Sequence, residues 1–280
     1  MPLEDEFCDI IKKARIGQAR AVADVAQIAG LPGSTIIALE RGVCPPDRHE
    51  VQALAKALGL RPGPLEQIAI EKWEPVAQHP TAWVETIQGS INGYGVQGYV
   101  VHDGEEAALI DTAYNASAMI EFLSVHCLRL MGVCLTHGHA DHADGIDRIL
   151  NHHEVPVYLG TEDIDLLSWR PPAPLLIQPE NGYTIPVGRL RIRCLAMPGH
   201  TPGGICYRVD AGSQSVCFVG DTLFAGSIGR SNPNALYQTH LQSVRTHVLG
   251  LPPEYRLLPG HGPATTVAEE LDHNPFGVDC

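Results

Sequence analysis

A short polar segment dense in histidine and aspartate follows an apolar run in the middle of the chain. The segment LTHGHADHADG, residues 135–145, contains three histidines and two aspartates within eight residues. Neutral imidazoles and carboxylates at this spacing are suited to zinc- or iron-class cations. We therefore predict that His137, His139, Asp141 and His142 belong to a metal site. The alternative is a polar surface loop that happens to be rich in histidine.

Three more polar side chains follow apolar, strand-like segments later in the chain. His200 lies in AMPGHTPGG, Asp221 in CFVGDTLFAG and His261 in LLPGHGPATT. Each follows a glycine, which permits close approach of the backbone, so each side chain can extend from a strand end toward a shared cleft. These positions would supply the further histidine and aspartate ligands that the first segment does not provide.

The predicted ligands must be positioned by a fold of mixed strands and helices. From Trp83 onward, β-rich runs alternate with glycine turns and helical stretches. The expected strands are AWVETI, GYVVHDG, EAALIDTA, GVCLT and VPVYLG in one group and GRLRIRCLAM, GGICYRV, SVCFVG and YRLLPGHG in another. The expected helices are NASAMIEFLSVHCL, ADGIDRILNHH and LYQTHLQSVRTHVLGL. This order predicts an α/β protein with two sheet layers covered by helices on both outer faces.

The beginning of the chain has a different pattern. Residues 1–70 are predicted to form a small helical domain, residues 71–82 a linker containing prolines, and residues 83–280 the second domain. The segments VADVAQIAG and LPGSTIIALERG predict two short helices joined at Gly30, and VQALAKALGL predicts another helix that ends at Gly59. Over about 50 residues, this part resembles the helix-turn-helix domain of phage-repressor-like regulators.

DNA recognition is less strongly indicated than this helical fold. On the second helix, Pro32, Gly33, Ile37 and Ala38 cannot make bidentate contacts to base edges. Residues 1–70 hold eight basic and nine acidic side chains, so they have no net positive charge for phosphate binding. The basic residues near the first helix are Lys12, Lys13, Arg15 and Arg20. The pattern favours dimerisation or partner docking over DNA binding, particularly if Ile37 is exposed.

The composition is that of an ordinary globular protein, with a net charge of -13. This charge gives no general attraction to nucleic acid or to anionic membranes. The acidic N-terminus lacks a signal-peptide pattern, and no apolar run approaches the roughly 18 residues of a membrane span, so we expect a cytoplasmic protein. The eight cysteines include no CxxC pair and are expected to be reduced and structural.

Four motifs in the second domain carry a family resemblance. The set THGHADH, PGHT, GDT and PGHG resembles the metallo-β-lactamase fold superfamily. GDTLFAGSIGRSN and GHGPATTVAEELDHNPF are similar to its glyoxalase II-like hydrolase branch, and the resemblance covers about residues 83–276. It implies an αββα sandwich, here preceded by the small all-α helix-turn-helix domain.

The resemblance also implies a dinuclear metal centre. One ion would be held by His137, His139 and His200 and the other by Asp141, His142 and His261, with Asp221 bridging them. Seven ligands are too many for one tetrahedral ion but leave open positions on two. Two divalent ions, with zinc favoured over iron or manganese, can share a water and lower its pKa to about 7, which makes hydroxide available at neutral pH.

Two other side chains are candidates for supporting roles. Asp111, at the end of ALIDT, is a candidate acceptor that holds a histidine ring in its metal-binding tautomer, or else a turn aspartate. Arg230, in GSIGRSN, lies where the branch has a basic residue near the substrate, and suits a carboxylate or phosphate group; the alternative is a surface arginine. Ala113 and Asn232 depart from the branch, which often has glycine and an acidic residue there.

Three functions remain open at this point. The favoured one is hydrolysis of a thioester, or a related small ester or lactone, by a metal-bridging hydroxide that Asp141 could orient. The glutathione-binding helical domain of glyoxalase II would follow His261, but only 19 residues do so here. One alternative is a mononuclear iron persulfide dioxygenase using His137, His200 and Asp221. The other is a DNA-binding regulator with a hydrolase-like sensor domain.

Overall fold

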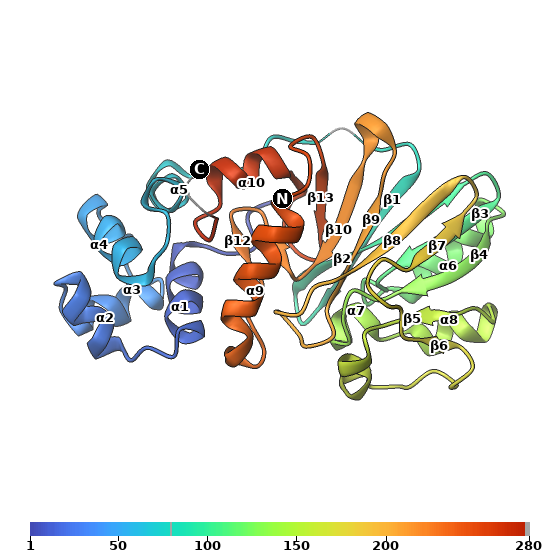
Figure 1. The fold of residues 1–280 in the computed structure, drawn as a ribbon, viewed down its shortest axis with the longest axis horizontal. Coiled ribbons are helices and arrows are strands. Elements are labelled where there is room, and N and C mark those ends of the chain that lie inside the picture. Colours follow the sequence, from blue (N-terminus) through green and yellow to red (C-terminus); the bar gives the residue numbers. More distant parts are fainter. Residues whose placement is uncertain (79, 278–280) are drawn as a thin grey trace.

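Two six-stranded sheets form the centre of the protein. We describe a computed structural model of the chain, in which residues 1–78 and 80–277 can be described. The strand orders are β1-β2-β3-β4-β5-β6 and β14-β13-β10-β9-β8-β7, and Figure 1 shows the two sheets with helices on either side. The predicted αββα sandwich is therefore confirmed. His79 and Cys280 lie outside the described residues.

The earlier strands along the chain form one sheet and the later strands form the other, apart from a short hairpin. The first sheet contains β1 Val84–Ile91, β2 Tyr94–Asp103, β3 Glu106–Ile110, β4 Arg129–Cys134, β5 Val157–Tyr158 and β6 Leu176–Ile177. The second contains β7 Thr184–Val187, β8 Leu190–Ala196, β9 Ile205–Val209, β10 Val216–Gly220, β13 Arg256–Pro259 and β14 Thr265–Thr266. The hairpin is formed by β11 Leu223–Phe224 and β12 Ser227–Ile228. The hairpin and the short strands β6, β7 and β14 were not predicted.

Alternating side chains on each strand separate the apolar layers. On β10, Phe218 packs between the two sheets, whereas Cys217 and Val219 face the outer layer of the second sheet. On β3, Ile110 packs between the sheets and Leu109 faces the helices of the first sheet. Because successive strand residues point to opposite faces, one run of buried apolar residues contributes side chains both to the layer between the sheets and to the layer under the helices.

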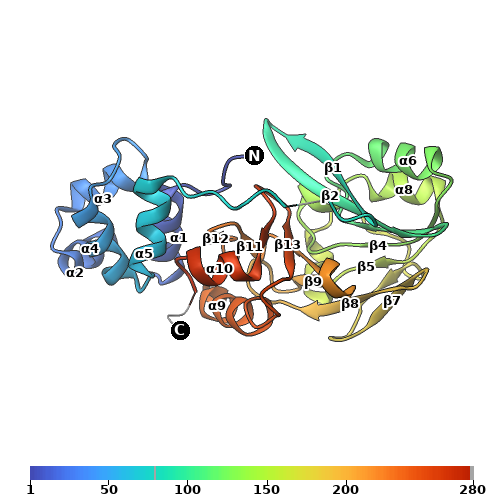
Figure 2. The ribbon, with the colours of Figure 1, turned by 90° about the horizontal axis from the view of Figure 1, so that it is seen from above.

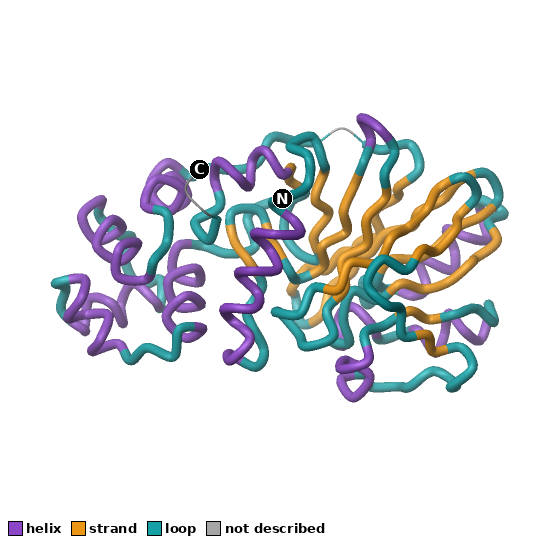
Figure 3. The backbone as a smooth tube through the Cα atoms, in the orientation of Figure 1, coloured by secondary structure: helices purple, strands orange, loops and turns teal. Residues whose placement is uncertain are grey.

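Helices cover both outer faces, and Figure 3 shows the strands between them. The first sheet is covered by α6 Ala116–Val125 and α8 Ile146–His152, and the short α7 Ala140–Ala143 precedes α8. The second is covered by α9 Tyr237–Ser243, the π-helix η5 Val244–Val248 and α10 Val267–His273. The helix predicted from Ala143 begins instead at Ile146, after Gly145, whose φ of 94° belongs to the left-handed region that glycine tolerates, and α7 was not predicted.

The N-terminal residues are helical as predicted. Within the described residues 1–78, the six helices are α1 Phe7–Gly17, α2 Val22–Ala29, α3 Gly33–Glu40, α4 Arg48–Leu58, α5 Pro62–Glu66 and the π-helix η1 Gln67–Glu71. The three predicted segments correspond to α2, α3 and α4. Gly30 and Gly59 end α2 and α4 with φ near 66°, as the sequence indicated. The axis turns by 112° between α2 and α3, and no single helix among the described residues is long and apolar enough to cross a membrane.

These helices pack directly on the outer layer of the second sheet. Figure 2 shows α9 and α10 between the N-terminal helices and the strands, and one buried apolar cluster runs from α1 through α9 to β10. Trp73, in the predicted linker, stacks on His273 of α10 with ring centroids 4.7 Å apart. Arg61 donates a 2.6 Å hydrogen bond to the carbonyl of Leu271. The N-terminal helices are thus part of the layered structure.

Candidate metal centre

All seven predicted ligands lie at the same end of the two sheets. The loop after β4 carries His137 and His139, and α7 carries Asp141 and His142. The remaining three lie just beyond strands β8, β10 and β13 of the second sheet and are His200, Asp221 and His261. The shared cleft expected from the strand ends is therefore formed by segments far apart in the sequence.

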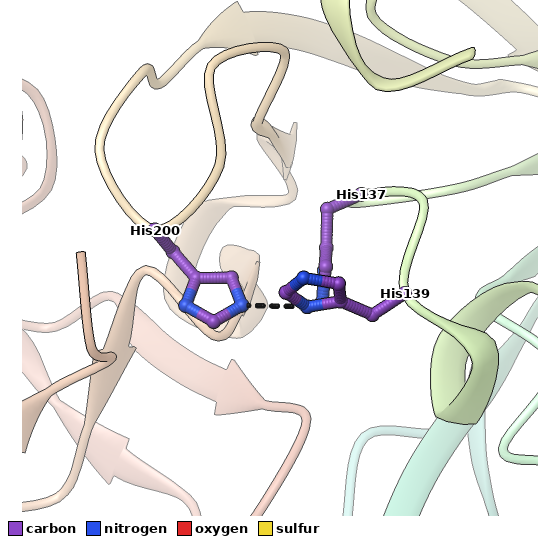
Figure 4. Close-up of side chains that lie close together, drawn as sticks. All are labelled: His137, His139 and His200. Atoms are coloured by element: carbon purple, nitrogen blue, oxygen red, sulfur yellow. Dashed lines mark hydrogen bonds between the residues drawn. The ribbon is translucent and has the colours of Figure 1, made fainter. Parts of the chain in front are cut away.

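One group of ligand atoms comes from the three histidines in Figure 4. The rings of His137, His139 and His200 point toward one another, and their ligand atoms lie within 4.8 Å of one another. Nε2 of His200 is 3.0 Å from Nδ1 of His139. Three imidazole nitrogens converging in this way can hold one divalent cation and leave coordination positions open.

A second group lies beside the first. Nε2 of His142 is 3.3 Å from Nε2 of His261, which is in turn 3.3 Å from Oδ2 of Asp141. Asp141 is the more exposed member of this group, because a quarter of its side chain is accessible while that of His142 is fully buried. Asp141 is therefore the member of this group that solvent reaches most easily.

Asp221 lies between the two groups. Its Oδ1 is 3.3 Å from Nε2 of His142 and 3.7 Å from Nε2 of His261. Its Oδ2 is 3.7 Å from Nε2 of His200. The two oxygens of one carboxylate thus face different groups of histidines, which is the arrangement that a bridging ligand requires.

Two buried atoms in the centre test whether the residues suit a cation. Nε2 of His137 and Oδ1 of Asp221 are buried and have no hydrogen-bond partner among the described residues. A buried polar atom without a partner costs about 1–3 kcal/mol, and both atoms carry lone pairs that a cation would accept. The donor set therefore fits one or two divalent ions.

Burial also controls the charge of the first histidine group. It lowers the pKa of His137 well below its ordinary value and lowers the pKa of His200 to about 4. Burial opposes charge on Asp221 too, but the neighbouring His142 holds the pKa of this carboxyl well below its ordinary value. Neutral imidazoles beside an ionised carboxylate are the forms that bind metal.

Asp111 lies at the position that the predicted acceptor role requires. Its Oδ2 accepts a 2.9 Å hydrogen bond from Nδ1 of His142 and a 2.7 Å bond from Oγ1 of Thr136. Its Oδ1 accepts a 2.7 Å bond from the backbone N–H of Thr136. Because Nδ1 of His142 donates its proton here, the neutral ring has its lone pair on Nε2, which lies toward the centre.

Backbone carbonyls orient two other rings in the same way. Nδ1 of His261 donates to the carbonyl of Gly95 at 2.6 Å, and Nδ1 of His200 donates to the carbonyl of Arg230 at 2.8 Å. The predicted substrate residue Arg230 thus contacts a ligand through its backbone. Its exposed side chain lines a pocket of about 190 Å³ between this loop and α1, where Lys12, Lys13, Asp5 and Asp9 also lie.

Asp163, which was not among the predicted residues, joins the loops that carry the first histidine group. This fully buried carboxylate accepts hydrogen bonds from Oγ1 of Thr201 at 2.6 Å, from the N–H of Gly203 at 2.7 Å and from the N–H of Gly138 at 3.2 Å. Gly138 separates His137 from His139. In the sequence, TEDID resembles an acidic surface turn, so no local signal distinguishes Asp163.

His240 has no ligand-like neighbours in the sequence, so no role was assigned to it. In the structure it is buried between the segments that contain Thr222 and Ser231. Its Nε2 donates a 2.8 Å bond to the carbonyl of Thr222, and its Nδ1 accepts from Oγ of Ser231 at 3.1 Å. Burial lowers the pKa of His240 to about 3, so the ring is neutral. It therefore connects the segment after Asp221 to the loop beside His200.

The N-terminal residues reach the rim of the centre. Nζ of Lys13 donates a 2.6 Å hydrogen bond to the carbonyl of Ile228 and lies 5.3 Å from the ring centroid of Phe224. The Phe224 ring is 5.9 Å from the ring of His261. A Cβ atom on Gly262 would lie 3.1 Å from the backbone nitrogen of Glu4. The first helix and the residues before it thus contact the segments that follow Asp221 and His261.

Comparison with known proteins agrees with this fold and site. Residues 91–261 match the model of the metallo-beta-lactamase superfamily, and the chain belongs to this family. It is 31% identical over 189 residues to the hydroxyacylglutathione hydrolase GloC of Haemophilus influenzae, covering 62% of this chain and 88% of that protein.

Two other relatives have metals in their names. The probable polyketide biosynthesis zinc-dependent hydrolase PksB of Bacillus subtilis is 29% identical over 204 residues, covering 69% of this chain and 86% of that protein. The crystal structure of TTHA1623 in a di-iron-bound form has a TM-score of 0.59 and 31% identity, covering 68% of this chain and 99% of that chain. The chain is thus a metallo-hydrolase superfamily member with a glyoxalase II-like relative.

Proposed function

We propose that the protein is a dinuclear metal-dependent hydrolase that cleaves thioesters or related small esters and lactones. The observation that carries the proposal is the position of Asp221, whose two oxygens face separate groups of histidines. With Asp221 shared, each group offers three ligands of its own and one carboxylate oxygen, a set that suits one ion per group.

The proposed ligands fall into two sets. His137, His139 and His200 would hold one ion, Asp141, His142 and His261 the other, and Asp221 both. Zinc is favoured, and iron or manganese are the alternatives. The names of two relatives, one zinc-dependent and one crystallised with two irons, support a divalent transition metal without choosing between them.

The protein's own groups would bind and orient the substrate around this centre. When bound, the metal pair supplies hydroxide at neutral pH and stabilises negative charge on the substrate carbonyl. The second oxygen of the partly exposed Asp141 would orient the attacking water and accept its proton. Breakdown of the tetrahedral adduct would then release a thiolate, or an alcohol that takes up the proton held by Asp141, so no nucleophilic side chain is needed.

Arg230 is the proposed contact for an anionic end of the substrate. Its side chain is exposed beside Lys12 of α1, whereas Lys13 is engaged by Asp5. In the variant Arg230→Ala, KM for a succinyl thioester should rise about tenfold, while KM for the uncharged butyryl thioester stays the same. Equal changes for both substrates would contradict this contact. The control is Arg170→Ala, since Arg170 is exposed and bonded to Asp165 on the surface.

The test of the proposed function is metal content per chain, measured on protein purified without added metal, together with hydrolysis of a thioester panel. We expect about two ions per chain, and turnover that is lost in His139→Ala but kept in the control His152→Ala, whose side chain is exposed. One iron per chain, no hydrolysis and oxygen uptake with glutathione persulfide would instead establish the dioxygenase alternative.

We propose that the N-terminal helices serve association between chains in preference to DNA binding. Arg15 bonds Glu40 at 2.5 Å, and Arg20 donates to the carbonyl of Ala57, so the basic cluster is largely engaged within the protein. Ile28 and Ile37 are exposed by 56% and 41%. A homodimer should be seen by light scattering and weakened by Ile37→Glu. Salt-dependent DNA binding by the full chain would favour the regulator alternative.

A further inference from the structure

A second pocket lies between the N-terminal helices and the hydrolase fold, and it does not include the metal centre. Its volume is about 310 Å³. One wall is the end of α4 with Gln18 and Arg20, and the other is α9 with Arg245 of η5. It shares no lining residue with the pocket that contains Arg230.

The pocket is lined by cations without compensating acids. Arg20, Lys56 and Arg245 line it, whereas no aspartate or glutamate among the described residues does so. The whole chain has 32 acidic and 19 basic side chains, so a cavity with only positive charge runs against its composition. Neutral donors are present as well, in the side chains of Gln18 and Gln238.

The two guanidinium groups are fixed in place by backbone carbonyls. Arg20 donates to the carbonyl of Ala57. Arg245 donates to the carbonyls of Phe276 and Gly277 at 3.0 and 3.2 Å. Within the described part of the chain, no carboxylate forms an ion pair with Arg20, Lys56 or Arg245. Carbonyl partners orient these side chains but leave their charge uncompensated, and each guanidinium keeps further N–H donors.

We propose that this pocket binds a small anion through phosphate or carboxylate oxygens. Planar guanidinium groups match both kinds of oxyanion by bidentate hydrogen bonds, and the exposed Lys56 would add a point charge. The volume suits a ligand of metabolite size. This proposal is independent of the proposed hydrolysis, because it concerns residues away from the metal ligands.

A bound anion would contact two parts of the protein at once. It would bridge α4 of the N-terminal helices and α9, which carries His240 as well as the pocket residues Tyr237 and Gln238. Because His240 holds Thr222 and Ser231 beside the proposed metal ligands, the pocket and the centre share α9 as a support. Binding should therefore stabilise the packing of the N-terminal helices on the hydrolase fold.

The test is a calorimetric titration of the full-length protein with sodium pyrophosphate and, separately, with citrate at low ionic strength. We expect saturable binding of at least one of the two anions. Saturation by pyrophosphate alone would identify phosphate oxygens as the ligand chemistry, and saturation by citrate alone would identify carboxylates. The absence of saturation with both anions would overturn the proposal.

Three variants locate the bound anion. Lys56→Glu and Gln238→Glu each place a negative charge on one wall, at exposed positions, and should weaken binding about tenfold or more. Arg41→Glu makes the same charge change as Lys56→Glu at an exposed position outside the pocket and should leave the affinity within about twofold. Pyrophosphate also binds metal ions, so His139→Ala tests whether it binds at the metal centre instead. If it binds in the pocket, this variant should leave the affinity unchanged. Equal affinity of the wall variants and Arg41→Glu for the anion, or loss of that affinity in His139→Ala, would show that the anion does not bind in this pocket.

Discussion

Asp111 and His142 form a hydrogen bond of 2.9 Å that determines which nitrogen of the histidine faces the centre. Both side chains are buried, and Nδ1 of His142 donates to a carboxylate oxygen that also accepts from Thr136. The opposite nitrogen, Nε2, lies 3.3 Å from Oδ1 of Asp221. The ring's orientation is thus set by a strand-end aspartate that is not itself in the group of ligand atoms.

Asp111→Asn should therefore reduce occupancy of the second group of ligands. An amide N–H beside Nδ1 of His142 would favour the tautomer that is protonated on Nε2, which cannot bind metal. We expect about 10- to 100-fold weaker retention of one metal ion per chain, measured by dialysis against a chelator and elemental analysis. Asp103→Asn, at a carboxylate paired with Arg189 on the surface, is the control. Equal retention in both variants would show that Asp111 does not orient the ring.

Asp163→Asn should loosen the two loops that carry the first histidine group. The amide would present an N–H to one of the donors that now share this buried carboxylate, namely Gly138, Thr201 and Gly203. An unsatisfied buried donor costs about 1–3 kcal/mol, and we expect this loss in the free energy of unfolding.

The same variant should also lose metal from the first group, which a purely structural defect elsewhere would not cause. Denaturant unfolding and metal analysis together measure both effects. Asp165→Asn is the matched control, because Asp165 lies in the same short helix, η2 Thr161–Leu166, with 93% of its side chain exposed. Unchanged metal content in Asp163→Asn would mean that the loops hold their geometry without the carboxylate.

Gly17→Ala should disturb the packing of α1 on α9. A Cβ atom at Gly17 would lie 2.3 Å from Cδ2 of Tyr237, so the helix or the ring must move. Overpacking of this kind costs about 1–3 kcal/mol, measurable by thermal or denaturant unfolding. Gly63→Ala is the control, because its Cβ would meet no atom within 4 Å and should be neutral or slightly stabilising. Equal stability of the two variants would contradict the close packing of α1.

Glu270 should make the stability of the protein fall as the pH rises from about 5 to 7. Burial raises the pKa of this carboxyl from 4.5 to about 7, although Asn274, Thr265 and the N–H of Gly226 donate hydrogen bonds to it. Between these two values the folded chain keeps a proton that the unfolded chain has lost. The stabilisation is therefore complete below the unfolded pKa and is lost as the pH rises through the folded pKa.

The predicted change in the free energy of unfolding is at most about 3 kcal/mol. It is measured by denaturant unfolding at several pH values in Glu270→Gln and in the wild type. The slope between pH 5 and 7 should be smaller in Glu270→Gln, which cannot titrate, and unchanged in the control Glu254→Gln at an exposed position. Parallel pH profiles for wild type and Glu270→Gln would show that the buried carboxyl does not take up the proton.

Residue types and their spacing along the chain predicted the candidate ligands and the layers of the fold. His137, His139 and Asp141 lie within five residues, and the glycine before His200 follows a recognisable strand. Local spacing and strand-end position were sufficient here, because consecutive residues of a short loop cannot separate far in space. Alternation and glycine positions likewise indicated most strands and the ends of α2 and α4.

The support that distant groups give to the predicted ligands could not be inferred from the sequence and follows from the packing of the whole chain. Asp163 and His240 have no local pattern, because their partners lie 25 to 40 and 9 to 18 residues away along the chain. The packing of Gly17 on Tyr237 and the cationic pocket around Arg20 and Arg245 also depend on how the N-terminal helices meet the second sheet. Such contacts are set by the complementary surfaces of packed elements, which residue type and spacing within a single element do not specify.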